Sequence, residues 1–289
     1  MSTSSITILG GDLRQCYAAE YLLQAGWQVT CFHTPDFPWN AEISFADSIS
    51  QALNASDLIL APTPLSKDGI HLFQTCSDPP CLLTELWDAL TPDKTFVVHS
   101  LPKETEQKLT QKGCPIFSFS QSPVFSAENA LLTGEGLLAE LIRYTPFSLS
   151  SANVLLLGYG CCGSAIGTLL HPICRSLSLL EQEEWKRSQA ESKGICPITW
   201  EDFSKVLPTC SLVINTIPKQ ILEPAQIRLL SDACHIFDIA SAPFGFPDDL
   251  TEQYLLPYFR LPGLPGRFSP ITSGELIGKI IERITDYVL

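Results

Sequence analysis

A glycine-rich turn at residues 158–163 carries the most specific chemical signal in this chain, with the sequence Gly158-Tyr159-Gly160-Cys161-Cys162-Gly163. An apolar strand is predicted directly before it, at residues 154–157, and a helix directly after it. The first glycine permits a tight turn, the second lets backbone N–H groups approach a phosphate, and the third lets the helix pack close to the strand. Because a helix N-terminus also attracts anions, the turn predicts a site for the pyrophosphate of a dinucleotide.

The end of the next strand, predicted over residues 176–180, selects between dinucleotides in such sites. A carboxylate there accepts hydrogen bonds from the 2′-hydroxyl of the adenine ribose, whereas a 2′-phosphate prefers Arg or Lys. Glu181 lies 18 residues beyond Gly163 and begins an acidic run, which favours NAD. Lys186 and Arg187 follow closely and keep NADP open, and the whole stretch is alternatively the solvated start of a helix.

Two polar loops come directly after predicted strands in this half of the chain, namely Asn215-Thr216-Ile217-Pro218 and Asp238-Ile239-Ala240-Ser241. Ligands of open parallel sheets bind beyond the carboxyl ends of strands, so both loops are expected to face the nicotinamide. We therefore predict cofactor contacts from residues 215–218 and from Ala240 and Ser241. The same residue types also favour turns, so ordinary turn chemistry is the alternative.

Two arginines are the candidate binders of an anionic substrate. Arg14 lies at the start of a predicted helix, where its charge opposes the helix dipole unless an anion compensates it. Arg267 ends the Pro- and Gly-rich segment 261–267, which would bring its guanidinium near the active-site cleft. The alternatives are a surface salt bridge of Arg14 with Asp12 and a simple linker at 261–267.

The composition argues against several classes of protein. With 31 Asp and Glu against 18 Lys and Arg, the formal net charge of −13 would repel a nucleic acid. Eleven cysteines without CxxC spacing argue against a zinc site and favour buried thiols in a reducing compartment. The hydrolase motifs GxSxG and HExxH are absent. No stretch approaches the ~20 apolar residues of a membrane span, and the N-terminal residues lack the features of a signal peptide, which predicts a cytoplasmic protein.

Strands alternate with helices along the chain, which predicts an α/β protein with parallel sheets. A second strand–glycine–helix opening occurs near the N-terminus, at residues 6–25. We expect an N-terminal substrate-side domain over 1–127, a connecting helix over 128–150 and a dinucleotide-binding Rossmann domain over 151–269. Within the connection, the apolar helical pattern runs from Glu128 to Tyr144. The apolar C-terminal helix, 270–289, is expected to pack back on the first domain. Further predicted strands are 28–32, 58–61, 95–98, 115–119, 211–215, 235–239 and 258–259.

Six short motifs occur in order over nearly the whole chain: Gly10-Gly11-Asp12-Leu13-Arg14-Gln15, Glu135-Gly136, Leu157-Gly158-Tyr159-Gly160, Ile214-Asn215-Thr216-Ile217-Pro218, Asp238-Ile239-Ala240-Ser241, and Pro262-Gly263-Leu264-Pro265-Gly266 followed by Pro270 and Thr272. Each is modest by itself, but as an ordered set they resemble the A-subunit family of dipicolinate synthase. The resemblance implies two Rossmann-like or flavodoxin-like domains, arranged as in formate and 2-hydroxyacid dehydrogenases.

The resemblance also implies an activity, which is the oxidation of dihydrodipicolinate to pyridine-2,6-dicarboxylate, the spore-core chelator, with NADP as the usual oxidant. It implies a sporulating cell, a cytoplasmic location and, as partner, a flavoprotein-like B subunit. Because the product ring is aromatic, positioning of the substrate and binding of its two carboxylates would carry most of the catalysis. Glu135 is a candidate base for dehydration of a hydroxylated precursor.

The chain departs from the family pattern at three places. Ala242 stands where Arg is usual, Ile271 stands where Lys is usual, and the acidic run Glu181-Gln182-Glu183-Glu184 replaces a basic position. Two alternatives therefore stay open. One is a diverged 2-hydroxyacid or amino-acid dehydrogenase, and the other is a dinucleotide-binding regulatory subunit without turnover of its own. The sequence leaves the oligomeric state open, a homo-oligomer included.

Overall fold

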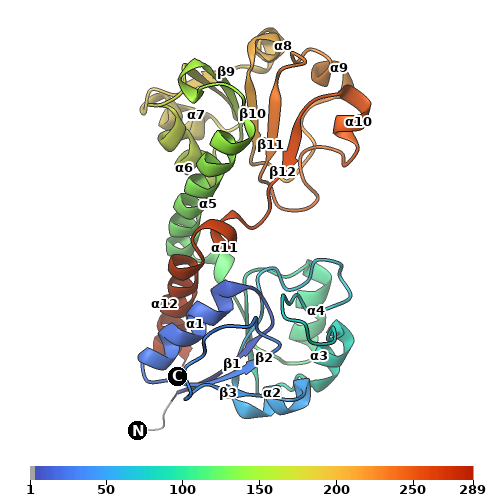
Figure 1. The fold of residues 1–289 in the computed structure, drawn as a ribbon, viewed down its shortest axis with the longest axis vertical. Coiled ribbons are helices and arrows are strands. Elements are labelled where there is room, and N and C mark those ends of the chain that lie inside the picture. Colours follow the sequence, from blue (N-terminus) through green and yellow to red (C-terminus); the bar gives the residue numbers. More distant parts are fainter. Residues whose placement is uncertain (1–3, 289) are drawn as a thin grey trace. The chain divides into compact units, whose positions relative to one another are not determined.

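A computed structural model describes residues 4–288 of the chain and divides them into two compact units (Figure 1). Unit 1 comprises the described residues up to Glu128 together with those from Ser269 onward, and unit 2 comprises Asn129–Phe268. Each unit contains one six-stranded sheet in which all paired strands are parallel. The two parallel sheets confirm the predicted α/β fold class.

The sheet of unit 1 has the strand order β3-β2-β1-β4-β5-β6. Its central strands are short apolar runs whose residues are almost all buried, as expected for a parallel sheet covered on both faces. The order reverses between β1 and β4, so the loops after these two strands diverge. The strands are β1 (Ser5–Leu9), β2 (Gln28–Phe32), β3 (Ser44–Phe45), β4 (Leu58–Leu60), β5 (Thr95–Val98) and β6 (Ile116–Ser118).

Two groups of helices cover the faces of this sheet. The helices α1 (Leu13–Gln24) and α12 (Pro270–Val288) lie side by side on one face and share its core with the sheet. The other face carries α2 (Ile49–Ala55), α3 (Leu83–Ala89) and α4 (Lys103–Gln111). A hydrogen bond of 2.7 Å from the Tyr21 hydroxyl to Glu282 Oε2 ties α1 to α12.

The sheet of unit 2 has the strand order β12-β11-β10-β7-β8-β9, which repeats the order of unit 1 if β7 is counted as the first strand. This is the strand order of a Rossmann domain, and its reversal falls between β7 and β10. The strands are β7 (Asn153–Leu157), β8 (Ser176–Leu180), β9 (Cys196–Ile198), β10 (Leu212–Asn215), β11 (His235–Asp238) and β12 (Tyr258–Arg260).

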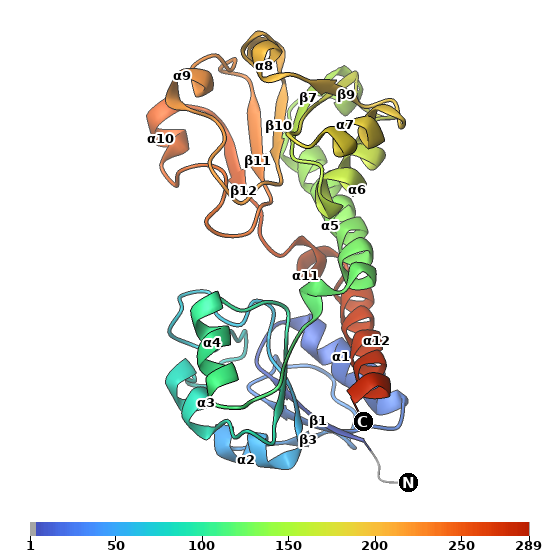
Figure 2. The same ribbon diagram turned by 180° about the vertical axis from the view of Figure 1, so that it is seen from behind.

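Helices also cover both faces of the second sheet (Figure 2). One face is packed by the C-terminal part of α5 (Pro123–Tyr144) with α6 (Cys161–Leu170), α7 (Glu184–Glu191) and α11 (Leu264–Phe268). The opposite face is packed by α8 (Trp200–Val206), α9 (Pro224–Ile227) and α10 (Leu250–Tyr254). Short 3₁₀ turns complete the chain at η1 (Phe119–Gln121), η2 (Leu149–Ser151) and η3 (Leu207–Thr209).

Some element boundaries differ from the prediction for local reasons. The connecting helix begins at Pro123, five residues before the predicted start, and ends at Tyr144 as the apolar pattern predicts; Pro146 has no N–H to continue the helical hydrogen bonds. Helix α6 begins at Cys161, inside the glycine turn, with Gly160 as its N-cap. The predicted C-terminal helix is present from Pro270 to Val288, and Leu289 lies outside the described residues.

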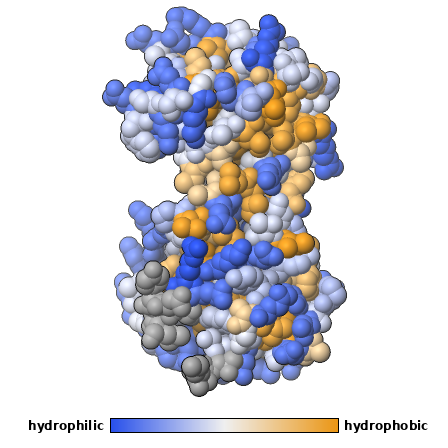
Figure 3. Space-filling model, turned by 90° about the vertical axis from the view of Figure 1, so that its left-hand side faces the viewer, coloured by the Kyte–Doolittle hydropathy of each residue, from blue (hydrophilic) through white to orange (hydrophobic). Residues whose placement is uncertain are grey.

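The surface of unit 2 carries apolar side chains that gather beside hydrophilic ones, as Figure 3 shows for one face. A helix that spans a membrane needs about 20 apolar residues in succession. Within residues 4–288, no helix is both long enough and apolar enough to cross a membrane.

Candidate functional site

A cavity of about 440 Å³ lies in unit 2 beside the carboxyl ends of β7, β8 and β10. Its walls come from three loops and from the start of α8, which the parallel sheet brings to one edge. The lining residues are Gly158–Gly163, Leu180–Glu183, Lys186, Trp200, Thr216–Lys219 and Ile221. All six residues of the glycine turn and Glu181 therefore lie together, as the motif predicts.

The glycine turn has the close contacts that its residue types require. Gly158 has φ 91°, and its N–H donates to the carbonyl oxygen of Leu180 at 3.0 Å. A Cβ at Gly163 would lie 2.2 Å from the Gly158 carbonyl oxygen, so only glycine fits there. A Cβ at Gly160, by contrast, would have no neighbour within 4 Å in the described part of the chain, which leaves the turn open on that side.

The start of α6 offers unused donors to this open side. The first hydrogen bond at this end runs from Ser164 N–H to Gly160 carbonyl at 2.9 Å, so the N–H groups of residues 161–163 precede the helical ladder. Glycine at the N-cap has no side chain that could cap them. Donors of this kind at a positive helix end fit a pyrophosphate, and the residues present are therefore suited to a dinucleotide.

The carboxylate of Glu181 is fixed at the rim of the cavity by two backbone donors. Its Oε2 accepts from Tyr159 N–H at 2.9 Å, and its Oε1 accepts from Glu183 N–H at 3.0 Å. These bonds join the glycine turn to the loop after β8. The carboxylate thus has the position and the order that a ribose acceptor needs, whereas a solvated helix start would leave it free. Direct contact with a ribose stays a prediction.

The loop after β10 enters the cavity, but Asn215 does not. This residue is fully buried, and its amide nitrogen donates to Asp238 Oδ1 at 2.8 Å and to the Ile217 carbonyl at 3.0 Å. Its amide oxygen accepts from Ile217 N–H at 3.1 Å. Thr216, Ile217 and Pro218 line the cavity instead. The polar atoms of Asn215 are used within the protein and hold the loop whose next residues line the cavity, while its predicted contact with a cofactor stays a prediction.

The loop after β11 is organised by Asp238, which is fully buried. Its carboxylate accepts from Asn215, from the N–H groups of Ala240 at 3.2 Å and Gly245 at 2.9 Å, and from the Tyr258 hydroxyl at 3.2 Å. Burial raises the pKa of Tyr258 to about 12, so this hydroxyl remains a donor at neutral pH. Four donors, from the end of β10, the loop after β11 and the start of β12, therefore converge on one carboxylate.

Ala240 and Ser241 are not among the residues that line the 440 Å³ cavity in the described chain. Ala240 is buried, whereas Ser241 and the neighbouring Ala242 are exposed. The predicted contact of both residues with the nicotinamide therefore has no support from the cavity. The contact stays a prediction.

The two candidate arginines are both paired with carboxylates of their own unit. Arg14 is nearly buried and bonds both oxygens of Asp12, with Nε–Oδ1 at 2.9 Å and an Nη2–Oδ2 contact of 2.8 Å, and it also donates to the Thr63 carbonyl. This is the salt bridge that the sequence offered as the alternative. Arg267 bonds Glu140, which is fully buried and would otherwise be an unpaired charge. Glu135, the candidate base, is exposed on α5.

The sequence did not point to Trp200, Lys219 or Ile221 as lining residues. Trp200 follows the three-residue strand β9, which contains a proline and shows no strand periodicity. Lys219 and Ile221 follow the predicted Asn215–Pro218 loop by a few residues. A prediction that extended this loop beyond Pro218 would have included both residues.

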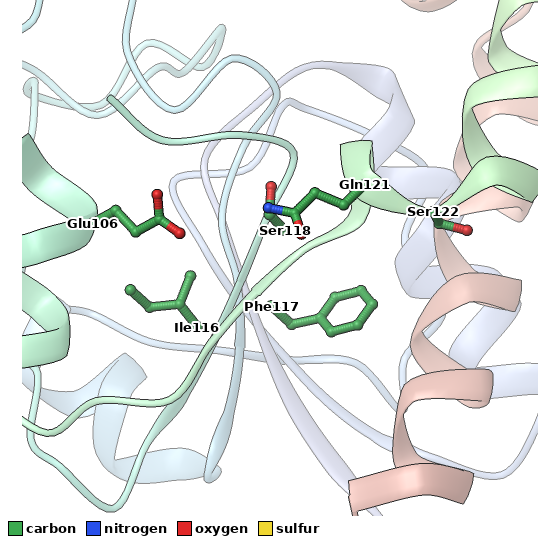
Figure 4. A pocket seen from close by; sticks show the side chains of 6 residues that line it. All are labelled: Glu106, Ile116, Phe117, Ser118, Gln121 and Ser122. Carbon is green, nitrogen blue, oxygen red and sulfur yellow. The ribbon is translucent and has the colours of Figure 1, made fainter. Parts of the chain in front are cut away.

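A second cavity of about 370 Å³ lies in unit 1 along the edge strand β6 (Figure 4). Glu106 of α4 and Gln121 of η1 both extend over the strand from opposite sides, while the Phe117 ring points away from Glu106. Of the six residues that line this cavity in the described chain, none is cationic. A carboxylate beside hydroxyl and amide groups would repel a dicarboxylate, so this cavity does not fit an anionic substrate.

A partly buried titratable group, His99, follows the carboxyl end of β5. Burial and, to a smaller extent, the positive charge of Arg14 lower the pKa of His99 to about 4. Its ring packs edge-on against Phe119 and Phe125, with centroid distances of 5.4 and 5.8 Å. The imidazole is therefore neutral in the folded protein at pH 5–7.

This shift predicts a loss of stability in mild acid. Between pH 6.5 and 4 the unfolded chain binds a proton at His99 that the folded chain does not, so stability falls as the pH falls, by at most about 3 kcal/mol. Urea unfolding at pH 7 and pH 4.5 should show this difference in the wild type and much less of it in His99→Phe. His171→Phe, on the surface of unit 2, should keep the wild-type difference. Equal acid sensitivity of His99→Phe and wild type would contradict the assignment.

The repeated strand order and the glycine-turn cavity define the fold of two-domain nicotinamide-dinucleotide dehydrogenases. Residues 5–119 match the family model for the N-terminal domain of the dipicolinate synthase A subunit. The A subunit of dipicolinate synthase from Bacillus subtilis (strain 168) is 23% identical over 156 residues, which is 54% of this chain and 52% of that protein. The matched part thus spans about half the length of that relative.

Solved structures extend the likeness in fold to the whole chain. The crystal structure of the dipicolinate synthase A subunit from Bacillus halodurans has a TM-score of 0.88 at 19% identity and covers 98% of each chain. The apo-structure of D-lactate dehydrogenase from Escherichia coli has a TM-score of 0.61 at 9% identity, covering 98% of this chain and 96% of that one. The resemblance to the A-subunit family of dipicolinate synthase that the motifs indicate is therefore confirmed.

Proposed function

We propose that this protein is a nicotinamide-dinucleotide-dependent oxidoreductase of the dipicolinate synthase A type, which oxidises dihydrodipicolinate to pyridine-2,6-dicarboxylate. The observation that carries the proposal is the 440 Å³ cavity at the N-terminus of α6, in a chain whose residues 5–119 match the N-terminal domain of that family. The cytoplasmic location and the link to sporulation come with the proposal from the sequence and the resemblance.

Three segments of this chain would each bind a different part of the dinucleotide. The N–H groups at the start of α6 would hold the pyrophosphate, and Glu181 would hold the adenine ribose. Thr216, Ile217 and Pro218 would contact the nicotinamide end, in positions fixed by Asn215. When bound, the nicotinamide supplies the hydride acceptor. Because aromatisation of the ring is favourable, the protein needs to orient the substrate more than to activate it.

The substrate carboxylates would bind to cations, and Arg14 and Arg267 remain our candidates. Arg14 would have to share its guanidinium between Asp12 and the substrate. The Arg267 side chain is 45% exposed and bonds Glu140 through one nitrogen, so it keeps further N–H donors for a ligand. Glu135 remains the candidate base for a preceding dehydration, and its exposure on α5 leaves it accessible.

A second candidate function is a dinucleotide-binding regulatory subunit without turnover of its own. The pairing of both candidate arginines with carboxylates of the chain favours it, since neither is free to bind an anion without competition. The relatives are named as one subunit of a synthase, and a flavoprotein-like B subunit is the partner that the proposal includes.

One assay separates these functions. The full-length protein is mixed with the product of dihydrodipicolinate synthase and with NAD or NADP, with and without the B subunit, and the ultraviolet absorbance of pyridine-2,6-dicarboxylate is followed. We expect product and reduced nicotinamide in equal amounts. Tight cofactor binding without turnover in any mixture would favour the regulatory subunit. Turnover of a 2-hydroxy acid or an amino acid instead would favour a diverged dehydrogenase, and binding of neither cofactor would contradict the proposal.

A further inference from the structure

One wall of the 440 Å³ cavity is formed by Trp200, whose side chain is 53% exposed. Its ring contacts the fully buried Phe203 edge-on, with the centroids 5.6 Å apart and the planes at 78°. This contact fixes the indole at the first position of α8, just after β9, the neighbour of β8. A large aromatic surface is thus held in place and left uncovered beside a cavity, as in sites where side chains stack on bases.

The carboxylate of Glu181, which follows the neighbouring strand β8, lines the same cavity. Since both of its oxygens accept backbone N–H groups, the carboxylate is held in one orientation and keeps further acceptor capacity. The 2′-hydroxyl of an adenine ribose can donate to it. A 2′-phosphate in that place would face a fixed negative charge instead.

The two cations that follow Glu181 in sequence, Lys186 and Arg187, are already engaged, which removes the usual support for a 2′-phosphate. The Lys186 ammonium bonds the Glu183 carboxylate, and the Coulomb attraction of Glu181 reaches it as well. Arg187 donates through Nη1 to the carbonyl oxygens of Glu181 and Gln182, at 3.1 and 2.6 Å. Along the loop after β8 and the start of α7, the cavity is therefore lined by two carboxylates, Glu181 and Glu183, and by one ammonium, Lys186.

From these contacts we infer that the adenosine half of the dinucleotide lies between Glu181 and Trp200, and that the site takes NAD(H) in preference to NADP(H). The inference rests on the proposed dinucleotide site. It adds Trp200 as the surface on which the adenine stacks and Glu181 as the residue that selects the unphosphorylated ribose. Both residues act in binding, so their effects are measurable without turnover.

Small probes test the charge part of the inference. Calorimetric titration of the full-length protein with 5′-AMP and with adenosine 2′,5′-bisphosphate should give at least roughly tenfold tighter binding of 5′-AMP. Glu181→Gln keeps the shape of the side chain and one acceptor, and it should narrow this ratio roughly tenfold. Glu184→Gln is the matched control, because Glu184 is exposed and is not one of the lining residues in the described chain. It should leave the ratio unchanged.

A pair of tryptophan variants tests the stacking part. Trp200→Ala should lower the affinity for 5′-AMP and for NADH roughly tenfold and leave the affinity for nicotinamide mononucleotide unchanged. Trp200→Phe should restore most of the lost affinity. Trp185→Ala is the control, since Trp185 is 62% exposed and lies close to Glu181 in sequence, yet its indole N–H is bonded to Glu183 at 2.6 Å. Melting temperatures of all variants show that each one folds.

The outcomes separate this inference from the proposed function. Equal affinity for 5′-AMP and for the 2′,5′-bisphosphate would overturn the inference, and so would equal effects of the two tryptophan-to-alanine substitutions. If the protein still bound NADPH in that case, the oxidoreductase proposal would stand. Failure of the wild type to bind NADH and NADPH alike would overturn both.

Discussion

Replacing Gly163 by alanine is expected to reduce both dinucleotide affinity and stability. The new Cβ would lie 2.2 Å from the Gly158 carbonyl oxygen, which is backbone and cannot rotate away. The turn must then move off the start of α6, and overpacking of this kind costs about 1–3 kcal/mol. Because the displaced N–H groups would no longer converge on the pyrophosphate, NADH affinity should fall roughly a hundredfold, or ~3 kcal/mol. Urea unfolding and calorimetric titration measure the two effects.

Two other glycines provide matched controls. Gly160→Ala places its Cβ in open space, so stability should be retained while the methyl group obstructs the approach of the pyrophosphate. Gly134→Ala lies within α5, where the new Cβ would make an ordinary contact of 3.5 Å with Leu169, and it should leave both quantities near the wild-type values. A Gly163→Ala protein with wild-type affinity would show that the turn does not bind a dinucleotide.

Removing the carboxylate of Asp238 is expected to be the most destabilising single change in unit 2. Asp238→Ala would leave four donors without their acceptor: the Asn215 amide, two backbone N–H groups and the Tyr258 hydroxyl. Each unsatisfied buried donor costs about 1–3 kcal/mol, and partial relaxation brings the expected total to roughly 3–5 kcal/mol. NADH affinity should also fall, because Asn215 loses one of the bonds that hold the 216–218 loop.

The control for this change belongs to the same region. Asp248 bonds Arg260, which in turn donates to the Tyr258 hydroxyl at 3.2 Å, but Asp248 is 85% exposed. Asp248→Ala removes an exposed salt bridge and should change the free energy of unfolding by less than about 1 kcal/mol. If Asp238→Ala unfolded at the same urea concentration as Asp248→Ala, the network would not hold the loops together.

The central part of the fold could be predicted from the sequence because it depends on local patterns. Strands such as β4 and β7 are short apolar runs that stop before a proline or a glycine, and parallel sheets bury such runs on both faces. The edge strands β3 and β9 were not predicted, since two or three half-exposed residues have too little periodicity. The end of α5 at Tyr144 was predicted, because the apolar helical pattern stops there.

The site divides in the same way between local and distant determinants. The glycine turn and Glu181 were found because close backbone contacts restrict the residue type at fixed spacings. Trp200 was missed, since its place at the cavity depends on β9 pairing with β8. For Arg267, the partner Glu140 is 127 residues away in sequence, and only the packing of α11 on α5 brings the two together. The sequence alone shows that Arg267 is charged, but it does not show which carboxylate in the folded protein pairs with it.

The interruption of unit 1 by unit 2 has a consequence for synthesis on the ribosome. Residues Leu276, Ile277, Ile280, Ile281 and Ile284 of α12 complete the apolar core beneath α1. These residues are translated after the whole of unit 2. Although the N-terminal part of unit 1 emerges from the ribosome before unit 2, its core can close only after α12 has been made, whereas unit 2 is continuous in sequence and can fold earlier. A nascent or truncated chain therefore exposes the apolar side of α1, and quality control can recognise incomplete copies by that surface.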